Sequence, residues 1–394
     1  MRRVIMHLDL DAFFCAVEEL LNPVLRGKAF VVGGSPTSRG VVSSASYPAR
    51  RHGVHSAMPT AQALRVCPNL IVVGHRHGVY GKYSTKVMTL LHEYTNVLQQ
   101  ISVDEAWFDM TGFENDPHAL GLEIQKRIAA EVHLPASIGI ATSKLVAKVA
   151  SSKAKPNGVL LISEGSEAAF LAPMSAGDLW GIGEATAKRL RQIGVLTIGD
   201  LQRASAASLQ RAFGNQAESV IARAHGIDES AVTNDGQIKN ISEENTFARD
   251  VADEHQLRNE LLSQCDRVAA RLRKHNLHAR TVHLKLRWPD FSTITRQTTL
   301  TQPTQLSDAL FAAIEKLWRQ NWKDRDYVRL IGVGVSSFSR DQQITLLDQA
   351  DRDSKHALAT VIDGLRGQYG DRIVERASLK HKPNSWTQYN TPFK

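Results

Sequence analysis

The pattern of apolar residues changes three times along the chain, and this change constrains the fold more than any other feature. Short strand candidates alternate with helix candidates up to about residue 165, beginning with an apolar run over residues 4–10 and helical spacing over residues 11–20. Short helices rich in Ala, Leu and Arg, broken by glycines, follow over residues 166–225. After a polar stretch, an amphipathic helix over residues 257–274 and flanking β segments appear. The sequence therefore predicts an α+β multidomain chain with a helical domain between two mixed ones.

Composition limits the class of protein. The 394 residues suffice for about two to four domains, and 42% hydrophobic with 22% charged residues is typical of soluble globular chains, not of disordered or collagen-like ones. No apolar run approaches ~18 residues and no signal-peptide core follows Met1, so we expect a cytoplasmic protein without a membrane partner. Three cysteines without a C-x-x-C pair disfavour a disulfide framework and a zinc site. The charge of +8 favours a polyanionic partner, although a solubilising surface explains it equally well.

Acidic residues stand at the ends of two apolar strand candidates. Asp9 lies near the end of the first run, and Asp104 and Glu105 lie between two later apolar stretches. Adjacent strand residues point to opposite faces, so Asp104 and Glu105 serve one site only at a turn or a strand end. Carboxylates that converge from two neighbouring strands suit Mg²⁺, and a pair of such ions supports phosphoryl transfer. The alternative is that each acid caps a helix or faces solvent.

Four segments occur in a recognisable order: His7-Leu8-Asp9-Leu10-Asp11-Ala12-Phe13-Phe14-Cys15-Ala16-Val17-Glu18, residues 41–50, Ser102 to Ala106, and Ala154-Lys155-Pro156-Asn157-Gly158. Together they resemble the Y-family translesion DNA polymerases, and the resemblance extends through about residue 340. It implies a right-hand polymerase fold with a ferredoxin-like palm (residues 1–10 and 76–165), small fingers (11–75), a helical thumb with a helix-hairpin-helix (166–231), a linker (232–241), an α/β little-finger domain (242–340) and a tail (341–394).

The resemblance implies roles for the acids. It makes Asp9 and Asp104 the bridging ligands of two Mg²⁺ ions, adds Glu105 to the shell of the catalytic ion, and assigns the Leu10 carbonyl to the nucleotide-associated ion. Asp11 is not a ligand in this pattern. We predict instead that Asp11 caps the helix that follows it.

The resemblance also implies a nucleotide site. Phe14 matches the steric gate that leaves no room for a ribose 2′-hydroxyl, and small residues around Ser44 match the roof over the nascent base pair. Arg and Lys side chains suit the triphosphate oxygens. Without the family pattern, Phe14 is explained by core packing and Lys155 by a solvated turn. The nucleotide contacts that the resemblance implies are Phe13, Phe14, Ser44, Tyr47, Arg50 and Lys155.

Two segments indicate contacts with DNA. Gly181 and Gly183 lie in a hairpin-like turn where backbone N–H groups can approach a phosphate, although Trp180 stands where the family commonly has proline. Residues 281–288 alternate with period two, so Lys285 and Arg287 face away from the core and suit a phosphate backbone. The alternatives are a tight turn between packed helices and a solvated strand face.

A third segment, residues 343–347, resembles the short peptide by which bacterial polymerases hold the sliding clamp. Gln343 matches the hydrogen-bonding position, and Leu346 and Leu347 match the apolar ones. The apolar edge of a strand that continues into the tail helix explains the same residues equally well.

The resemblance as a whole implies a Mg²⁺-dependent, template-directed DNA polymerase of low fidelity, without proofreading, that acts as a monomer on primer-template DNA and dNTPs during DNA damage tolerance. The alternative is a non-catalytic homologue that binds DNA and clamp as an adaptor and is expected to lack the acids at positions 9, 104 and 105. Another nucleotidyl transferase or cyclase explains the acids but not the hairpin motif. Trp107 also departs from the family, which usually has tyrosine or phenylalanine there.

Overall fold

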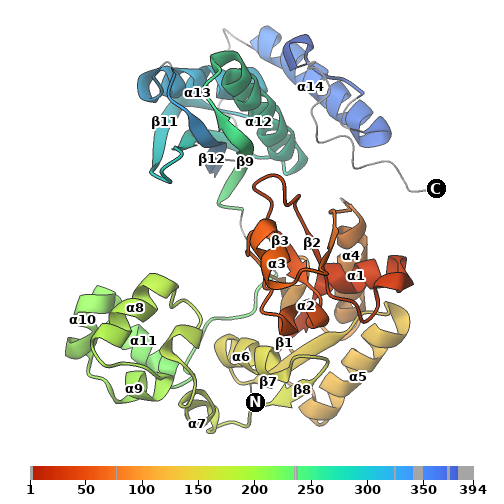
Figure 1. The fold of residues 1–394 in the computed structure, drawn as a ribbon, viewed down its shortest axis with the longest axis vertical. Helices are drawn as coiled ribbons and strands as arrows, with labels where there is room; N and C mark the ends of the chain where they lie inside the picture. The colour runs from red at the N-terminus through yellow and green to blue at the C-terminus, as the bar shows by residue number, and fades with distance from the viewer. Residues whose placement is uncertain are drawn as a thin grey trace. The chain divides into compact units, whose positions relative to one another are not determined.

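The chain forms two compact units, Met1–Gly236 and Gln237–Lys394 (Figure 1). The structure is a computed structural model that describes residues 3–76, 78–234, 236, 238–323, 325–339, 349–370 and 373–379, with only the backbone of residues 349–353. Within these residues no helix combines the length and the apolar character needed to cross a bilayer. Cys15, Cys67 and Cys265 are buried free thiols.

A five-stranded sheet forms the centre of the first unit. The strands lie in the order β5-β6-β1-β7-β8, with β1 antiparallel to both neighbours and β7 parallel to β8. All residues of β1 are buried because the strand is central and helices cover both faces of the sheet. The strand bounds are β1 Ile5–Leu10, β5 Leu98–Gln100, β6 Glu105–Asp109, β7 Ala136–Ala141 and β8 Val159–Leu161.

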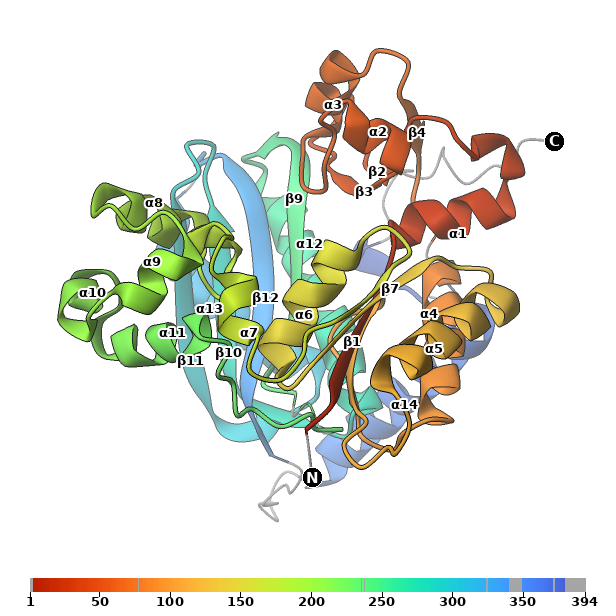
Figure 2. The same ribbon diagram turned by 90° about the horizontal axis from the view of Figure 1, so that it is seen from below.

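The two faces of this sheet pack against different helices. Met6 and Leu8 face α4 (Val79–His92) and α5 (Pro117–Glu131), whereas Ile5 faces α6 (Lys144–Ala154) and the helical part of the unit. Figure 2 shows α6 on one side of the sheet and α4 and α5 on the other. The close approach of α6 requires Gly139 on β7, since a Cβ there would lie 2.0 Å from the Ala147 carbonyl oxygen.

A smaller subdomain and a strand-free segment complete the first unit. The small sheet has the order β3-β2-β4 and its own apolar core. Residues 166–225 are all described and none lies in a strand, which confirms the predicted helical segment. The bounds are β2 Phe30–Gly33, β3 Val42–Ala45, β4 Ile71–Val73, α1 Phe13–Leu21, α2 Tyr47–Arg51, α3 Thr60–Val66, α7 Glu167–Leu171, α8 Glu184–Gln192, α9 Ile198–Arg203, α10 Ala206–Phe213 and α11 Ala217–Ala224.

The polar stretch after α11 contacts the five-stranded sheet and α6. The Lys144 ammonium donates to the Ala231 carbonyl at 3.3 Å, and the Leu98 N–H donates to the Asn234 side chain at 2.9 Å. Val232 is buried among the helices. Residues 232–236 of the predicted linker therefore belong to the first unit, and the division between the units, after Gly236, falls inside the predicted range of 232–241.

The second unit is a four-stranded antiparallel sheet, in the order β11-β10-β12-β9, with two long helices on one face. A third helix, α14, is held to α12 by a two-pronged ion pair between Arg273 and Asp363, at 2.6 and 2.9 Å. The bounds are β9 Asn240–Val251, β10 His278–Arg287, β11 Thr293–Thr304, β12 Val328–Ser339, α12 Glu254–Lys274, α13 Ser307–Asn321 and α14 Gln349–Tyr369.

Candidate active site

The sheet of the first unit brings the three predicted acids together. Asp9 of β1 and Glu105 of β6 are direct partners in the antiparallel register, and the Leu10 N–H donates to the Asp104 carbonyl at 2.9 Å. Asp9 is buried, with 6% of its surface exposed, whereas Asp104 and Glu105 are half-buried. Strand β1 and the start of β6 therefore bring Asp9, Leu10, Asp104 and Glu105 together at one sheet edge.

Basic and hydroxyl side chains compensate this acidic edge. The Lys155 ammonium lies 2.6 Å from Asp9 Oδ1, the Lys148 ammonium lies 2.7 Å from Glu105 Oε2, and the Ser102 hydroxyl donates to Asp104 Oδ1. Burial, aided by the neighbouring Glu105 and Asp104 carboxylates, raises the pKa of Asp9 to about 7 against the opposing effect of Lys155. The site thus concentrates negative charge that requires cations.

The donor set fits Mg²⁺ but is not a preformed cage. Carboxylate oxygens and a backbone carbonyl are hard ligands, and Mg²⁺ commonly uses one or two carboxylates with water and substrate phosphates. Across the described residues, no three His, Cys, Asp or Glu side chains already converge as ligands. Asp9, Asp104 and Glu105 instead contact Lys155, Ser102 and Lys148, respectively. These side chains must exchange their present partners to hold an ion.

Asp11 has a different role from the predicted one. The cap residue of α1 is Ala12, in a left-handed conformation with φ of 44°, and no side chain caps the helix, so the capping prediction is wrong. The fully buried Asp11 carboxylate accepts hydrogen bonds from Tyr47 Oη (3.2 Å), Ser137 Oγ (2.9 Å) and the Asn157 N–H (2.7 Å). It therefore ties together α2, β7 and the turn after Lys155.

The predicted gate residue lies in an aromatic cluster. Phe14 is half-buried, and its ring centre is 5.5 Å from that of Phe13 and 4.4 Å from that of Tyr80. The Tyr80 hydroxyl donates to buried Glu18 at 2.8 Å, and Arg76 donates to the other Glu18 oxygen at 2.9 Å. Our sequence analysis missed this support. Glu18 was the available signal, because it is an acid on the apolar face of a helix.

Two of the predicted triphosphate contacts, Tyr47 and Arg50, lie on α2. Ser44 of β3 is buried, whereas the Arg50 side chain is exposed and stacks on the Tyr47 ring, with 5.0 Å between guanidinium and ring centre. Arg50 Nε also donates to the Ala45 carbonyl at 2.9 Å. Burial and the Asp11 carboxylate raise the pKa of Tyr47, so its hydroxyl stays protonated and remains a donor. Helix α2 therefore carries a guanidinium and a phenol that suit an anion.

The hairpin glycines adopt the geometry that the turn requires. Gly181 has a φ of +93°, a backbone angle that residues other than glycine rarely adopt. Gly183 is the N-cap residue of α8. In the second unit, Lys285 reaches across Gly332 to Glu244, at 2.8 Å, and Arg287 donates to Thr293 Oγ1 at 2.9 Å. Both cations lie on the predicted open face, but each already has a partner.

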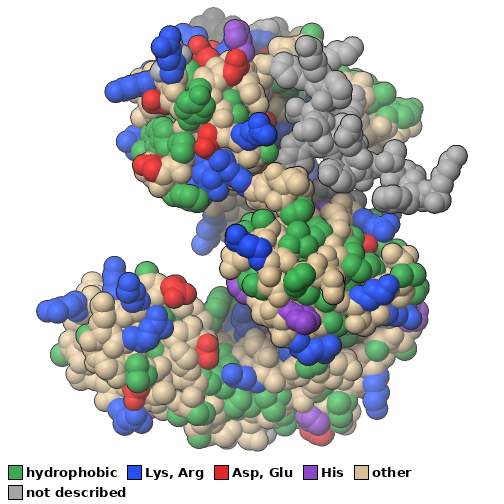
Figure 3. Space-filling view, in the orientation of Figure 1, with side chains coloured by type: hydrophobic (Ala, Val, Ile, Leu, Met, Phe, Trp, Pro, Cys, Tyr) green, Lys and Arg blue, Asp and Glu red, His purple; other side chains and the backbone are tan. Residues whose placement is uncertain are grey.

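Two further predictions concern the clamp-binding residues and the distribution of basic side chains. The predicted clamp residues Gln343, Leu346 and Leu347 lie outside the described residues. On the face seen in Figure 3, Lys and Arg side chains are spread over both units and do not gather in one patch.

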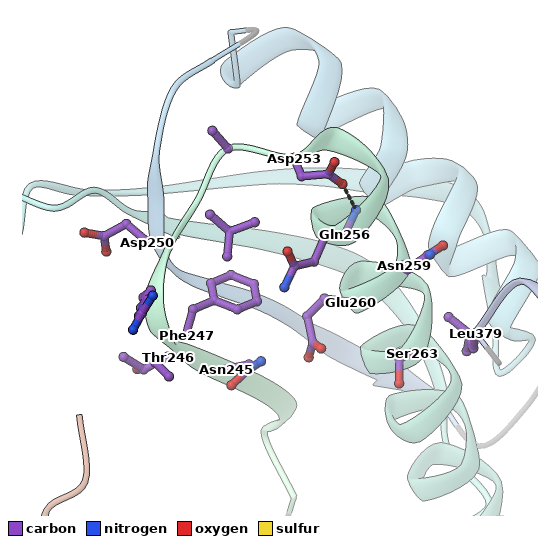
Figure 4. Close-up of a pocket in the computed structure, with 14 residues that line it drawn as sticks. Asn245, Thr246, Phe247, Asp250, Asp253, Gln256, Asn259, Glu260, Ser263 and Leu379 are labelled. Carbon is purple, nitrogen blue, oxygen red and sulfur yellow. Dashed lines mark hydrogen bonds between the residues drawn. The ribbon is translucent and has the colours of Figure 1, made fainter. Parts of the chain in front are cut away.

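A cavity of about 740 Å³ lies between β9 and α12 in the second unit (Figure 4). The Phe247 ring and polar side chains of α12, including Gln256 and Glu260, line it. Asp253 caps α12 there by accepting a hydrogen bond from the Gln256 N–H at 2.6 Å. No predicted site residue lines this cavity.

Family profiles match most of the chain. The impB/mucB/samB family matches residues 8–152, its C-terminal domain matches residues 238–347, and the thumb domain of DNA polymerase iota matches residues 177–228. DNA polymerase IV of Dehalococcoides mccartyi is 40% identical over 95% of this chain and 96% of its own. DNA polymerase IV of Clostridium kluyveri is 34% identical over 97% of this chain and 99% of its own.

Solved structures agree with these matches. A Y-family DNA polymerase chimera of Dbh and Dpo4 has a TM-score of 0.76 at 24% identity, covers 86% of this chain and all of its own, and supports the fold. DinB from Sulfolobus solfataricus has a TM-score of 0.59 at 27% identity and covers 84% of this chain and 98% of its own. The predicted right-hand fold, with a helix-hairpin-helix thumb and a little-finger domain, is confirmed. The chain belongs to the Y-family of translesion polymerases, and it is a DNA-directed DNA polymerase that resembles bacterial DNA polymerase IV.

Proposed function

We propose that this polymerase adds dNTPs to a primer 3′-hydroxyl by two-metal phosphoryl transfer during DNA damage tolerance, with low fidelity and without proofreading. The primer hydroxyl attacks the α-phosphate of a template-paired nucleotide, and pyrophosphate leaves. The family membership supports translesion synthesis, with primer-template DNA and a dNTP as the substrates. The observation that carries the mechanism is the pairing of Asp9 with Glu105 across β1 and β6.

We assign the metal ligands to Asp9, Asp104, Glu105 and the Leu10 carbonyl. Two bound Mg²⁺ ions would supply charge stabilisation on the phosphate oxygens and activation of the attacking hydroxyl. The burial of Asp9 and the mutual repulsion of the acids support this assignment, because both disfavour the site without cations. In the chain itself, Lys155 and Lys148 provide the compensating charge.

The nucleotide site uses residues from three segments. Tyr47, Arg50 and Lys155 bind the triphosphate, which offsets its charge and the charge that develops on pyrophosphate. Phe14, with Phe13 beside it, excludes a ribose 2′-hydroxyl. Ser44 is a small side chain over the base pair and leaves space for a distorted template base. The hydrogen bonds of Asp11 to Tyr47 and Asn157 support a common site for these segments.

The remaining parts of the chain bind DNA and, through the tail, a clamp. We propose a palm of residues 1–10 and 76–165, fingers of 11–75, a thumb of 166–231, a linker of 232–241, a little finger of 242–340 and a tail of 341–394. The polymerase acts as a monomer. The hairpin glycines and the open face of β10 bind the duplex backbone, and the tail binds the sliding clamp. The proposed DNA and clamp contacts are Gly181, Gly183, Lys285, Arg287, Gln343, Leu346 and Leu347.

Primer extension with Mg²⁺ tests this function against an adaptor role. The wild type should extend a labelled primer with the nucleotide complementary to the template, and EDTA should abolish extension. Asp104→Asn should bind the same primer-template in fluorescence anisotropy but lose extension. Binding without extension by the wild type would support the adaptor instead.

A further inference from the structure

Two tryptophans that depart from the family pattern contact each other. Trp107 lies on β6, two residues after Glu105, and Trp180 lies in the hairpin before Gly181. Their ring centres are 5.5 Å apart and their planes are inclined by 64°, an edge-to-face arrangement that is favourable for aromatic pairs. The contact therefore joins the strand that carries Glu105 to the glycine hairpin of the helical segment.

The surroundings of Trp107 connect it to the acidic edge. Trp107 is buried and its Nε1–H donates to the Lys144 carbonyl at 3.1 Å. The ammonium groups of Lys144 and Lys148 lie 4.6 and 5.7 Å from the Trp107 ring centre, within the range of cation–π attraction. The Lys148 ammonium is also 2.7 Å from Glu105 Oε2. Trp107 is thus the surface on which Lys148 lies when it pairs with Glu105.

The surroundings of Trp180 connect it to the hairpin backbone. Its side chain is 46% exposed, while its neighbour Leu179 is buried. At the next residue, a Cβ on Gly181 would lie 2.8 Å from a guanidinium nitrogen of Arg223. The hairpin is therefore bounded by Arg223 at Gly181 and by the Trp107 ring at Trp180. A displacement of the hairpin must change the indole contact.

We infer that Trp107 and Trp180 are positioning residues that couple the hairpin to the catalytic edge of the sheet. Through this pair, the backbone position that binds a DNA phosphate is fixed relative to Glu105 and Lys148. The inference rests on the proposed function, because it assigns the hairpin to DNA and Glu105 to the metals. It adds a route by which DNA binding and nucleotide incorporation depend on each other.

A double-mutant cycle tests the coupling. The variants are Trp180→Ala, Trp107→Leu and their combination, each measured for the Kd of a labelled primer-template by anisotropy and for kcat in single-nucleotide incorporation. Aromatic pairs contribute enough that we expect Trp180→Ala to raise Kd and lower kcat by about three- to tenfold each. In the Trp107→Leu background, the same substitution should change either quantity by less than about twofold.

Conservative variants and a control sharpen the test. Trp180→Phe and Trp107→Phe keep a ring at the contact and fold with smaller volume changes, so each should retain about half or more of wild-type kcat. Trp322→Phe removes an indole from the stacked Trp318–Trp322 pair of the second unit, whose ring centres are 4.6 Å apart, and should leave Kd and kcat unchanged.

The outcomes separate the coupling from the proposed function. Equal effects of Trp180→Ala with and without Trp107 would show that Trp180 contacts DNA independently, and would overturn the coupling. A change in Kd with unchanged kcat, or no change in either, would also overturn it. A Glu105→Gln variant with wild-type kcat would contradict the proposed function. The double-mutant cycle, measured by the Kd for primer-template, would still report whether the two indoles act together. A wild type that does not bind DNA overturns both.

Discussion

Replacing Asp11 by alanine should destabilise the first unit. The fully buried carboxylate accepts hydrogen bonds from Tyr47, Ser137 and Asn157 at 3.2, 2.9 and 2.7 Å. Hydrogen bonds to charged acceptors contribute about 1.5–3 kcal/mol each. Part of this stability is recovered in the variant, because the half-buried Tyr47 can turn toward water and because a buried charge is removed. We therefore expect a decrease of about 3 kcal/mol in the free energy of unfolding.

The same substitution should weaken nucleotide binding. Asp11 holds the hydroxyl of Tyr47, which is a proposed triphosphate contact, and the N–H of Asn157, two residues after Lys155. Its loss therefore frees Tyr47 directly and loosens the turn next to Lys155. Misplaced binding groups are costly, and we expect the KM for the dNTP to rise about tenfold. Urea unfolding followed by circular dichroism and steady-state primer extension measure the two effects.

A matched aspartate provides the control. Asp109 is half-buried at the end of β6, and its carboxylate accepts a hydrogen bond from the Thr111 N–H at 2.8 Å. Asp109→Ala should lower the free energy of unfolding by about 1 kcal/mol or less and leave the KM unchanged. An Asp11→Ala variant that matches the wild type in both stability and KM would refute the role we give to Asp11.

Three further substitutions test the gate, the open sheet face and the sheet packing. Phe14→Ala should admit ribonucleotides in primer extension, and unchanged sugar discrimination would remove the gate assignment. Glu244→Gln should free Lys285 and tighten primer-template binding about twofold at low salt, and this gain should be lost at high salt. If the affinity of the variant for primer-template did not depend on salt, the DNA role of that face would be contradicted. Gly139→Ala should destabilise the chain by roughly 3 kcal/mol or more in urea unfolding, since its Cβ would collide with Ala147, and a wild-type midpoint would contradict this packing.

The alternation of strands and helices was predictable because it is local. Apolar periodicity identified β1 and α12 to within a few residues of their observed bounds. Helix starts were less predictable, since the backbone decides them: Ala12 takes a left-handed conformation, so α1 begins at Phe13 and Asp11 turns away to Ser137. The nature of a side chain does not determine whether it caps a helix or binds across the fold.

The candidate site was predictable only where the family pattern or a strand end pointed to it. The residue types at positions 9, 104 and 105 indicate metal ligands, but their pairing depends on β6 lying beside β1, which is a contact across almost 100 residues. The partners of these acids were not predictable for the same reason. Lys148 lies 43 positions from Glu105, and Glu18 lies 62 positions from Tyr80. Only folding brings such pairs together.

Single-turnover incorporation by Glu105→Gln, with Mg²⁺ and a primer-template bound at saturation, tests the central claim most directly. Glu105 lies opposite Asp9 at the acidic edge, and its substitution keeps the shape of the side chain while removing a carboxylate charge. Because metal ligation supplies several kcal/mol of transition-state stabilisation, we predict a rate roughly a thousandfold below that of the wild type, with unchanged DNA affinity. A wild-type incorporation rate in this variant would contradict the proposed metal-dependent mechanism.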